Sequence, residues 1–119
     1  MLPNSSEFVI AYLASVAAGA VVVPLNDHYA LNEVTYFVDE CGISLLITSE
    51  LFRPLCEQVL SQTRTGSDLL FAEKWGVQEG SIDWMPPTPD PDAPVMYQFS
   101  SGFYGTSQAN RTHSPQPCF

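Results

Sequence analysis

Stretches with the periodicity of amphipathic helices alternate along this chain with short apolar stretches rich in β-branched residues. The strand-like stretches are 20–24, 43–48, 68–72 and 94–99. The first of these, 20–24, is wholly apolar, which is typical of strands in parallel sheets that are covered on both faces. Alternation with short connections indicates right-handed crossovers between neighbouring strands. The sequence therefore predicts an α/β fold, a partial parallel sheet with covering helices.

The first predicted helix has clear start and stop signals. Asn4 is a suitable N-cap, and Glu7 stands where its carboxylate can reach back as in a capping box. Phe8 and Tyr12 recur at helical spacing and begin an apolar stripe. Gly19 suits the left-handed position that follows a helix, so the helix is predicted to end there.

The second and third predicted helices follow the same logic. The second, over 32–41, is predicted to turn four side chains inward and to end at Gly42. These four are Val34, Phe37, Val38 and Cys41. The third helix, over 49–62, is predicted to be capped by Ser49 and kinked by Pro54.

Composition divides the chain into four segments. Residues 74–93 carry several prolines among Asp and Gly, which predicts an extended surface connection. This connection separates a βα-repeat region, 1–73, from a strand and loop at 94–108. Residues 109–119 show no periodicity and are predicted to form an irregular tail.

Charge excludes two classes of partner. The chain has 13 acidic and 4 basic residues, a formal net charge of −9. So few cations cannot form the basic patch that nucleic acid or an anionic lipid surface requires. We therefore expect neither a nucleic-acid partner nor a membrane-surface partner.

The uncharged run over residues 8–25 raises the question of export or membrane insertion. A secretory signal needs a positive segment ahead of the apolar run, and only Glu7 is charged there. A span would also have to accommodate Gly19 and Pro24. Three cysteines without C-x-x-C spacing favour neither a disulfide framework nor a zinc site. The sequence predicts a cytoplasmic protein.

Residues 97–108, Y-Q-F-S-S-G-F-Y-G-T-S-Q, have the composition of a loop that grips phosphate. Such loops hold phosphate oxygens with successive backbone N–H groups, aided by hydroxyls and glycines. The candidate cofactor-binding residues are Ser100, Ser101, Gly102, Gly105 and Thr106. A simple Ser/Gly turn at the end of a strand is the alternative. The lysine that usually completes such loops is missing, because the chain's one lysine is Lys74.

Two stretches resemble the adenylate-forming superfamily of AMP-dependent acyl-CoA synthetases and ligases. The first is L-P-N-S-S-E-F at 2–8 followed by A-A-G-A-V-V-V-P-L-N at 17–26. The second is Q-F-S-S-G at 98–102, which is similar to the start of the family's phosphate loop, with Gly105 and Thr106 also matching. The resemblance implies that this chain forms an incomplete N-terminal domain of the adenylate-forming fold.

The loop departs from the family pattern at four positions. Phe103 and Tyr104 replace small hydroxyl residues, Ser107 replaces a proline, and Gln108 replaces the lysine. Bulky aromatic side chains would crowd a backbone that must approach phosphate closely. Loss of the cation removes a charge-assisted contact. These departures predict weakened phosphate binding.

The resemblance implies a chemistry for the parent enzymes rather than for this chain. They use ATP and Mg²⁺ to convert a carboxylic acid into an acyl-adenylate, and then form a thioester with coenzyme A. This chain is predicted to be a truncated piece of such a ligase, inactive alone. No catalytic residue and no metal ligand is assigned, since no Ser/His/Asp or Cys/His set can be assembled.

The alternative function is a non-catalytic interaction module that retains part of the fold. Its contact surfaces would be an exposed sheet edge and uncovered apolar helix faces. Self-association through such a surface is the expected consequence. A carboxylic-acid substrate belongs only to the longer parent enzymes.

Overall fold

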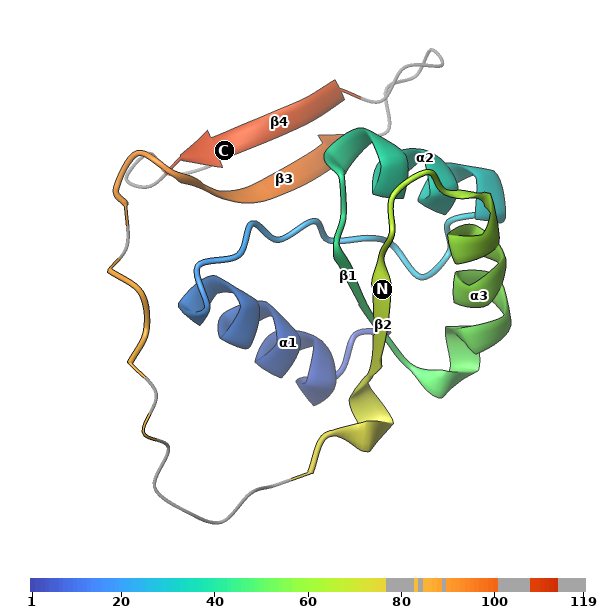
Figure 1. Ribbon diagram of the computed structural model, residues 1–119, viewed down its shortest axis with the longest axis horizontal. Helices are drawn as coiled ribbons and strands as arrows, with labels where there is room; N and C mark the ends of the chain where they lie inside the picture. Colours follow the sequence, from blue (N-terminus) through green and yellow to red (C-terminus); the bar gives the residue numbers. More distant parts are fainter. Residues whose placement is uncertain (77–82, 84, 89, 101–107, 114–119) are drawn as a thin grey trace. The chain divides into compact units, whose positions relative to one another are not determined.

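The computed structural model describes residues 1–76, 83, 85–88, 90–100 and 108–113 (Figure 1). The chain divides into two compact units. The first consists of Met1–Phe8 with Leu25–Ser81, and the second of Val9–Pro24 with Ile82–Phe119.

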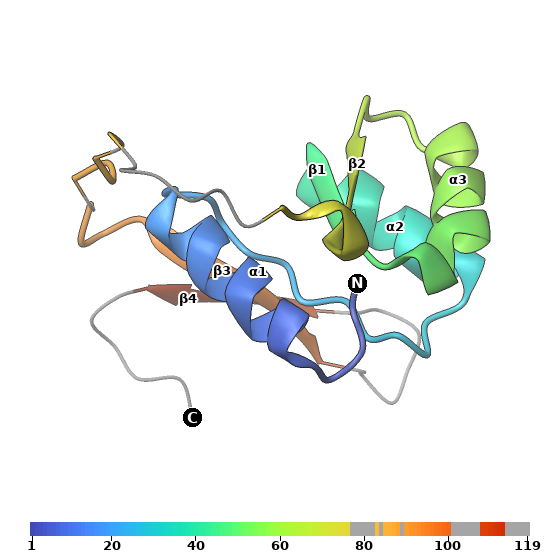
Figure 2. The same cartoon turned by 90° about the horizontal axis from the view of Figure 1, so that it is seen from below.

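The first unit is built on a two-stranded parallel sheet. Strand β1 (Leu45–Thr48) pairs with β2 (Asp68–Phe71), in a register that sets Thr48 opposite Phe71. Helix α3 (Arg53–Gln62) connects the two strands, and α2 (Leu31–Cys41) lies beside α3 in both views (Figures 1 and 2). The β1–α3–β2 arrangement is the parallel unit with a helical crossover that the alternating sequence predicted.

The two faces of this sheet differ in exposure. Leu46 and Thr48 of β1 and Phe71 of β2 are buried on one face. Leu45 and Leu70, on the opposite face, are 46% and 37% exposed. Side chains alternate between the faces of a strand, so one face is packed and the other is partly open.

The core of the first unit lies between the sheet and its helices. The largest fully buried side chains are Val34, Val38, Val59, Thr48 and Cys56. The predicted inward positions Val34, Phe37 and Val38 are confirmed, whereas Cys41 is only half-buried. Gly42 ends α2 with a φ of 60°, the left-handed conformation expected after a helix.

The predicted start of the third helix is wrong in detail. A 3₁₀ turn, η1 (Glu50–Phe52), comes first, and α3 begins only at Arg53. Ser49 makes no side-chain capping bond. Pro54 does not kink the helix, because it lies in the first turn, where its missing N–H has no partner to lose.

Helix α1 (Ser6–Ala17) contributes its residues from Val9 onward to the second unit. Its N-cap is Ser5 rather than the predicted Asn4, since the Ser5 hydroxyl accepts the N–H of Phe8 at 3.4 Å. Gly19 has a φ of 77° and confirms the predicted stop. The N–H groups of Gly19 and Ala20 donate hydrogen bonds to carbonyls of the last turn of α1, which is the Schellman arrangement.

The second unit contains an antiparallel strand pair. Strand β3 (Pro94–Ser100) confirms the predicted strand at 94–99, and it pairs with β4 (Gln108–His113). The prediction of an irregular tail from residue 109 onward is wrong for 109–113, because these residues belong to β4, a strand without an apolar alternation. The strand expected at 20–24 is reduced to a single parallel bridge between Val22 and Met96. The α/β class is confirmed, and β3 and β4 form a second two-stranded sheet besides β1 and β2.

Candidate functional site

The end of β3 is where the structure places the start of the candidate phosphate loop. Ser100 is the last residue of β3. The other four candidates, Ser101, Gly102, Gly105 and Thr106, lie outside the described residues. The phosphate-binding assignment therefore remains a prediction for all five.

The ladder between β3 and β4 defines the base of this loop. Ser100 pairs with Gln108, the first residue of β4, and Tyr97 pairs with Arg111. Gln108 occupies the position where the resembling family has its lysine. The two described residues that flank 101–107, Ser100 and Gln108, are thus directly paired.

Strand β3 is held from both edges before it reaches the loop. The N–H of Val22 donates to the carbonyl of Val95 at 2.9 Å, and the N–H of Tyr97 donates to the carbonyl of Val22 at 2.9 Å. On the other edge lies β4. A loop that leaves the carboxyl end of an interior strand is the usual place for ligand contacts in α/β folds.

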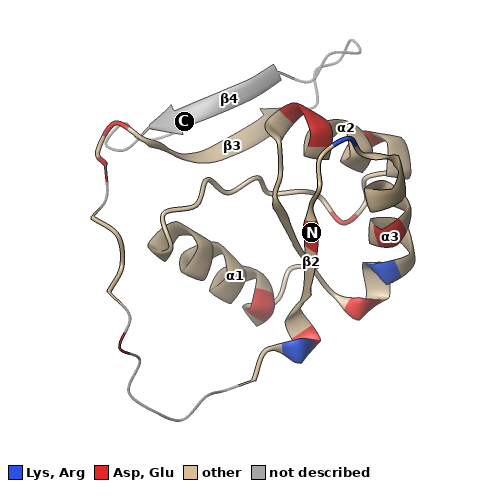
Figure 3. Cartoon of the chain, viewed as in Figure 1, with Lys and Arg blue, Asp and Glu red and all other residues tan. Residues whose placement is uncertain are grey.

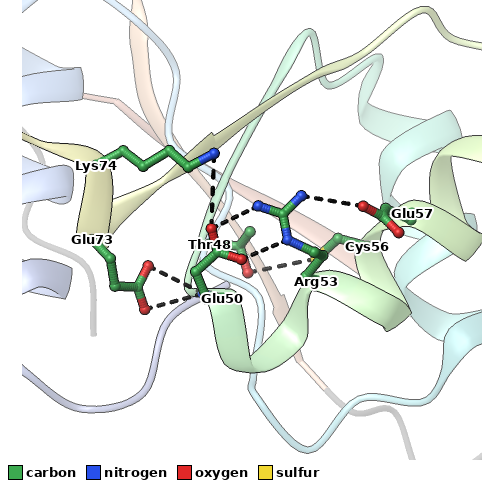
Figure 4. Close-up of polar contacts among 7 residues, drawn as sticks. All are labelled: Thr48, Glu50, Arg53, Cys56, Glu57, Glu73 and Lys74. Atoms are coloured by element: carbon green, nitrogen blue, oxygen red, sulfur yellow. Dashed lines mark hydrogen bonds and ion pairs between the residues drawn. The ribbon is translucent and has the colours of Figure 1, made fainter.

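A second constellation, which sequence reasoning missed, lies at the carboxyl ends of β1 and β2 (Figure 4). The Glu50 carboxylate accepts two hydrogen bonds from the Arg53 guanidinium, at 2.5 and 2.6 Å. Arg53 also donates to Glu57 at 3.2 Å, and Lys74 lies 3.9 Å from Glu50. The spacing of Glu50, Arg53 and Glu57, three and four residues apart, is the signal that could have revealed it.

This charge cluster joins the two strands. The backbone N–H of Glu50, just after β1, donates to both carboxylate oxygens of Glu73 at 3.0 and 3.1 Å. Glu73 belongs to the short 3₁₀ turn η2 (Ala72–Lys74), just after β2. The Arg53 guanidinium also sits 3.9 Å from the centre of the Phe71 ring.

The pKa shifts within the charge cluster indicate a structural role. Hydrogen bonds from Arg53 hold the pKa of the Glu50 carboxyl below its usual value. The same contacts raise the pKa of Arg53. A carboxylate that is already ion-paired and strongly ionised is a poor general acid, so the cluster fastens the sheet rather than transferring protons.

Two buried groups, a thiol and an amine, lie next to β1. The Cys56 thiol lies 3.5 Å from the Thr48 hydroxyl, and burial raises the pKa of that thiol. A thiol kept protonated is not an activated nucleophile. The Met1 amine is buried against the carbonyl of Ile47 at 2.5 Å, and burial lowers the pKa of the amine to about 6.

The remaining polar side chains of interest are also accounted for. His28 is exposed, and its backbone N–H donates to the Asn26 side chain at 2.9 Å, a local turn contact. Asp39 accepts the backbone N–H of Arg64 at 2.9 Å, which lowers the pKa of that carboxyl. Within the described residues, no group of three or more His, Cys, Asp or Glu side chains could hold a metal ion.

Of the candidate residues for ATP binding, the described part of the chain contains Ser100 alone. Gln108 stands at the position of the loop lysine in the resembling family. None of the helices in the described part is long and apolar enough to cross a membrane.

The first unit contains a parallel β–α–β unit, and β3 ends at Ser100, just before the Ser/Gly-containing sequence of residues 101–107. The sequence profile of the AMP-binding enzyme family matches residues 1–106. The chain therefore belongs to the AMP-binding enzyme family.

Curated relatives match short parts of the chain. The crotonobetaine/carnitine–CoA ligase of Salmonella arizonae is 33% identical over 64 residues, which is 54% of this chain and 12% of that protein. The oxalate–CoA ligase of Arabidopsis thaliana is 40% identical over 48 residues, 40% of this chain and 9% of that protein. The chain thus covers about a tenth of the length of these relatives.

Solved structures extend the likeness over nearly the whole chain. The apo structure of MbtA from Mycobacterium smegmatis superposes with a TM-score of 0.78 at 24% identity. It covers 94% of this chain, whereas this chain covers 23% of MbtA. At this identity the likeness shows the fold alone. The described fold therefore resembles one part of the fold of MbtA.

Proposed function

We propose that this chain is a piece of an AMP-dependent acyl-CoA ligase fold that does not catalyse the ligase reaction by itself. In the parent reaction, a carboxylate attacks the α-phosphorus of ATP, giving an acyl-adenylate and releasing pyrophosphate. The thiol of coenzyme A then displaces AMP and forms the thioester. Membership of the AMP-binding enzyme family and similarity to CoA ligases support this origin.

The observation that carries the proposed inactivity is the residue at the base of the loop. Gln108 opens β4 opposite Ser100, where the family has a lysine. A neutral amide cannot supply the charge-assisted hydrogen bond that a cation makes to phosphate. The neighbouring Phe103 and Tyr104 add bulk where a backbone must approach phosphate closely.

Titration of the chain with Mg²⁺–ATP by calorimetry, together with carboxylate-dependent ATP–pyrophosphate exchange, tests this proposal. We expect no saturable binding up to about 1 mM ATP, the concentration at which a weak site of about −4 kcal/mol would be half filled. Exchange catalysed by the unmodified chain would contradict the proposal.

A gain-of-binding variant sharpens this test. Gln108→Lys restores the cation at the end of the loop, and Gln98→Lys adds the same charge within β3 as a matched control. Tighter ATP binding by Gln108→Lys alone would show that the lysine position still faces a phosphate site. Equal behaviour of both variants would show that the loop no longer forms one.

A second candidate function is a non-catalytic interaction module that associates with itself. It is favoured by apolar side chains left open on α1 and on the outer face of the β1–β2 sheet. We also propose a cytoplasmic location, supported by the scarcity of cysteine and the absence of disulfide spacing. Size-exclusion chromatography with light scattering tests the self-association.

A further inference from the structure

Helix α1 has the composition of a helix from the interior of a protein. Every residue of α1 after Glu7 is apolar except Ser15. A helix that is apolar on all sides is normally buried in the core of a large protein. Within the described residues, however, Ala11 is the only buried residue of α1. The composition of α1 therefore indicates more cover than the described residues provide.

The open side of α1 is a strip formed by Val9, Ile10 and Leu13, which are 53%, 55% and 60% exposed. Residues four apart lie on the same face of a helix, so Val9 and Leu13 are neighbours and Ile10 lies beside them. Figure 3 shows α1 free of charge beyond its first turn, whereas acidic residues mark the other helices. A contiguous apolar strip of this kind marks a surface that another protein surface covers.

Solved structures of the same fold extend far beyond this chain. MbtA matches 94% of this chain, whereas this chain covers 23% of MbtA. The fatty acyl-CoA synthetase of Mycobacterium tuberculosis matches 95% of this chain with a TM-score of 0.68, and this chain covers 23% of that protein. In both structures, most of the fold lies outside the matched part. A core-type helix left open within that part is expected to be covered by the rest of the fold, because packed layers close a core.

Two other occupants fit the strip less well. A second copy of this chain would bring another net charge of −9 close to the first, and like charges repel. Helices that bind a lipid surface carry Lys or Arg beside their apolar face. The first basic residue of this chain is Arg53, far from α1 in sequence.

We propose that the strip of Val9, Ile10 and Leu13 is the surface through which this chain docks onto the rest of an AMP-binding enzyme fold, carried by a separate polypeptide. The inference rests on the proposed origin of the chain as a piece of that fold. The partner presents an apolar face without charge, because an unpaired charge buried against the strip would be costly. The docking does not depend on the phosphate loop.

The test offers this chain the rest of one such fold. The probe is MbtA of Mycobacterium smegmatis expressed without the part that superposes on this chain, and the full chain is refolded with a limiting amount of it. In each mixture the unmodified chain competes with an equal amount of one variant. Mass spectrometry of the purified complex gives the ratio of the two. Circular dichroism of each free variant shows that its helices are retained.

One variant carries Ile10→Gln and Leu13→Gln on the strip. The control variant carries Leu51→Gln and Met85→Gln, at side chains that lie outside α1 and are 75% and 86% exposed. We expect a complex with one copy of each polypeptide. In this complex the unmodified chain should exceed the strip variant at least about tenfold, equivalent to about 1.4 kcal/mol, and should exceed the control variant by less than about twofold.

Three results would overturn the proposal. Absence of a complex with the unmodified chain would overturn the docking. Equal incorporation of the strip variant, or equal exclusion of the control variant, would overturn the assignment to the strip. A dimer of the unmodified chain that the strip substitutions dissociate would identify a second copy as the cover instead. The ATP–pyrophosphate exchange described above is independent of these results, so failure of the proposed inactivity is distinguished from failure of the docking.

Discussion

The two units of this chain bury their apolar residues to very different extents. In the first, Val34, Val38 and Val59 are completely buried within a β–α–β unit and its neighbouring helix. In the second, α1 leaves three large apolar side chains at least half exposed. The contrast shows that belonging to one fold does not make two regions equally self-sufficient. A short crossover unit closes its own core, whereas α1 leaves an apolar face open.

The largest effect we expect from a single substitution is in the packed unit. Val38→Asp places a carboxylate where Val38 has no exposed surface, and an unpaired buried charge is among the most destabilising changes known. We expect a loss of at least about 4 kcal/mol in the free energy of unfolding. Urea denaturation followed by circular dichroism measures it.

Val9→Asp is the control for that substitution, since Val9 is 53% exposed on α1. It should cost no more than about 0.5 kcal/mol, as for most surface changes. Similar losses from the two variants would erase the distinction between the packed unit and the open helix.

The second prediction concerns the Met1 amine, which belongs to the packed unit. Burial lowers the pKa of this amine from 8.0 to about 6, so between those values the unfolded chain binds more protons than the folded one. Stability then rises with pH across the interval from 6 to 8, by at most about 2.7 kcal/mol. Conversely, it is lost as the pH falls from 8 to 6.

Unfolding measured at several pH values, for the free chain and for an N-acetylated chain, isolates this contribution. Acetylation removes the titrating amine, so the slope between pH 6 and 8 should flatten even if acetylation lowers stability overall. An unchanged slope would mean that other groups cause the pH dependence.

A third prediction compares the two helix-ending glycines, one in each unit. Gly19 has a φ of 77°, and a Cβ there would meet Cγ of Pro87 at 3.1 Å. Gly42 has a φ of 60° and nothing within 4 Å of such a Cβ. Both changes to Ala incur the left-handed cost of about 1–2 kcal/mol, and Gly19→Ala adds a steric contact.

Thermal unfolding ranks these two variants. We expect Gly19→Ala to lower the melting temperature more than Gly42→Ala. The reverse order would show that Pro87 does not pack against the end of α1.

The predictions on the glycines and the buried valines rest on features that could be predicted from the sequence, whereas the other predictions do not. The positions of Val34, Val38, Gly19 and Gly42 followed from helical periodicity and from the backbone freedom of glycine, both of which are local. Their success reflects the fact that a helix is specified by residues three and four apart.

Besides the local errors at the starts of α1 and α3, two errors concern strands, whose pairing is not set by local sequence. Strand β4 has no apolar alternation that would indicate a strand. It forms by pairing with β3, in a register that sets Ser100 opposite Gln108. The apolar stretch around Val22 has a sequence as typical of a strand as the other predicted strands, yet it forms a single bridge. A local pattern gives the propensity of a strand but not its partner.

The candidate site was predictable in part for the same reason. The sequence predicted a strand at 94–99 with Ser100 in the loop that follows, whereas Ser100 is the last residue of β3. The charge cluster was missed because Glu50 and Glu73 meet only when β1 and β2 lie side by side. Their spacing of 23 residues carries no local signal.

The smallest effect we expect is at this charge cluster. Arg53→Gln removes hydrogen bonds to Glu50 and Glu57 and the contact with the Phe71 ring. The groups are exposed, so the loss of stability should be small and should shrink in high salt. Arg64→Gln, which removes one exposed ion pair to Asp39, should cost less.

Unfolding in low and high salt measures both Arg variants. If Arg53→Gln were as mild as Arg64→Gln, the cluster would not fasten the ends of β1 and β2. The difference between the two units would then be due to apolar packing alone.

Residue-resolved hydrogen exchange of the chain, at a concentration low enough to keep it monomeric, tests the contrast between the two units most directly. The amides of Val34, Val38 and Val59 should open only with a high free energy, because they lie in a packed core. The amides of α1 from residue 13 onward should exchange at least about 100-fold faster, a difference of about 2.7 kcal/mol in opening free energy. Equal protection of the amides of α1 and of the packed core from exchange would contradict the claim that α1 lacks a covering surface within its own unit.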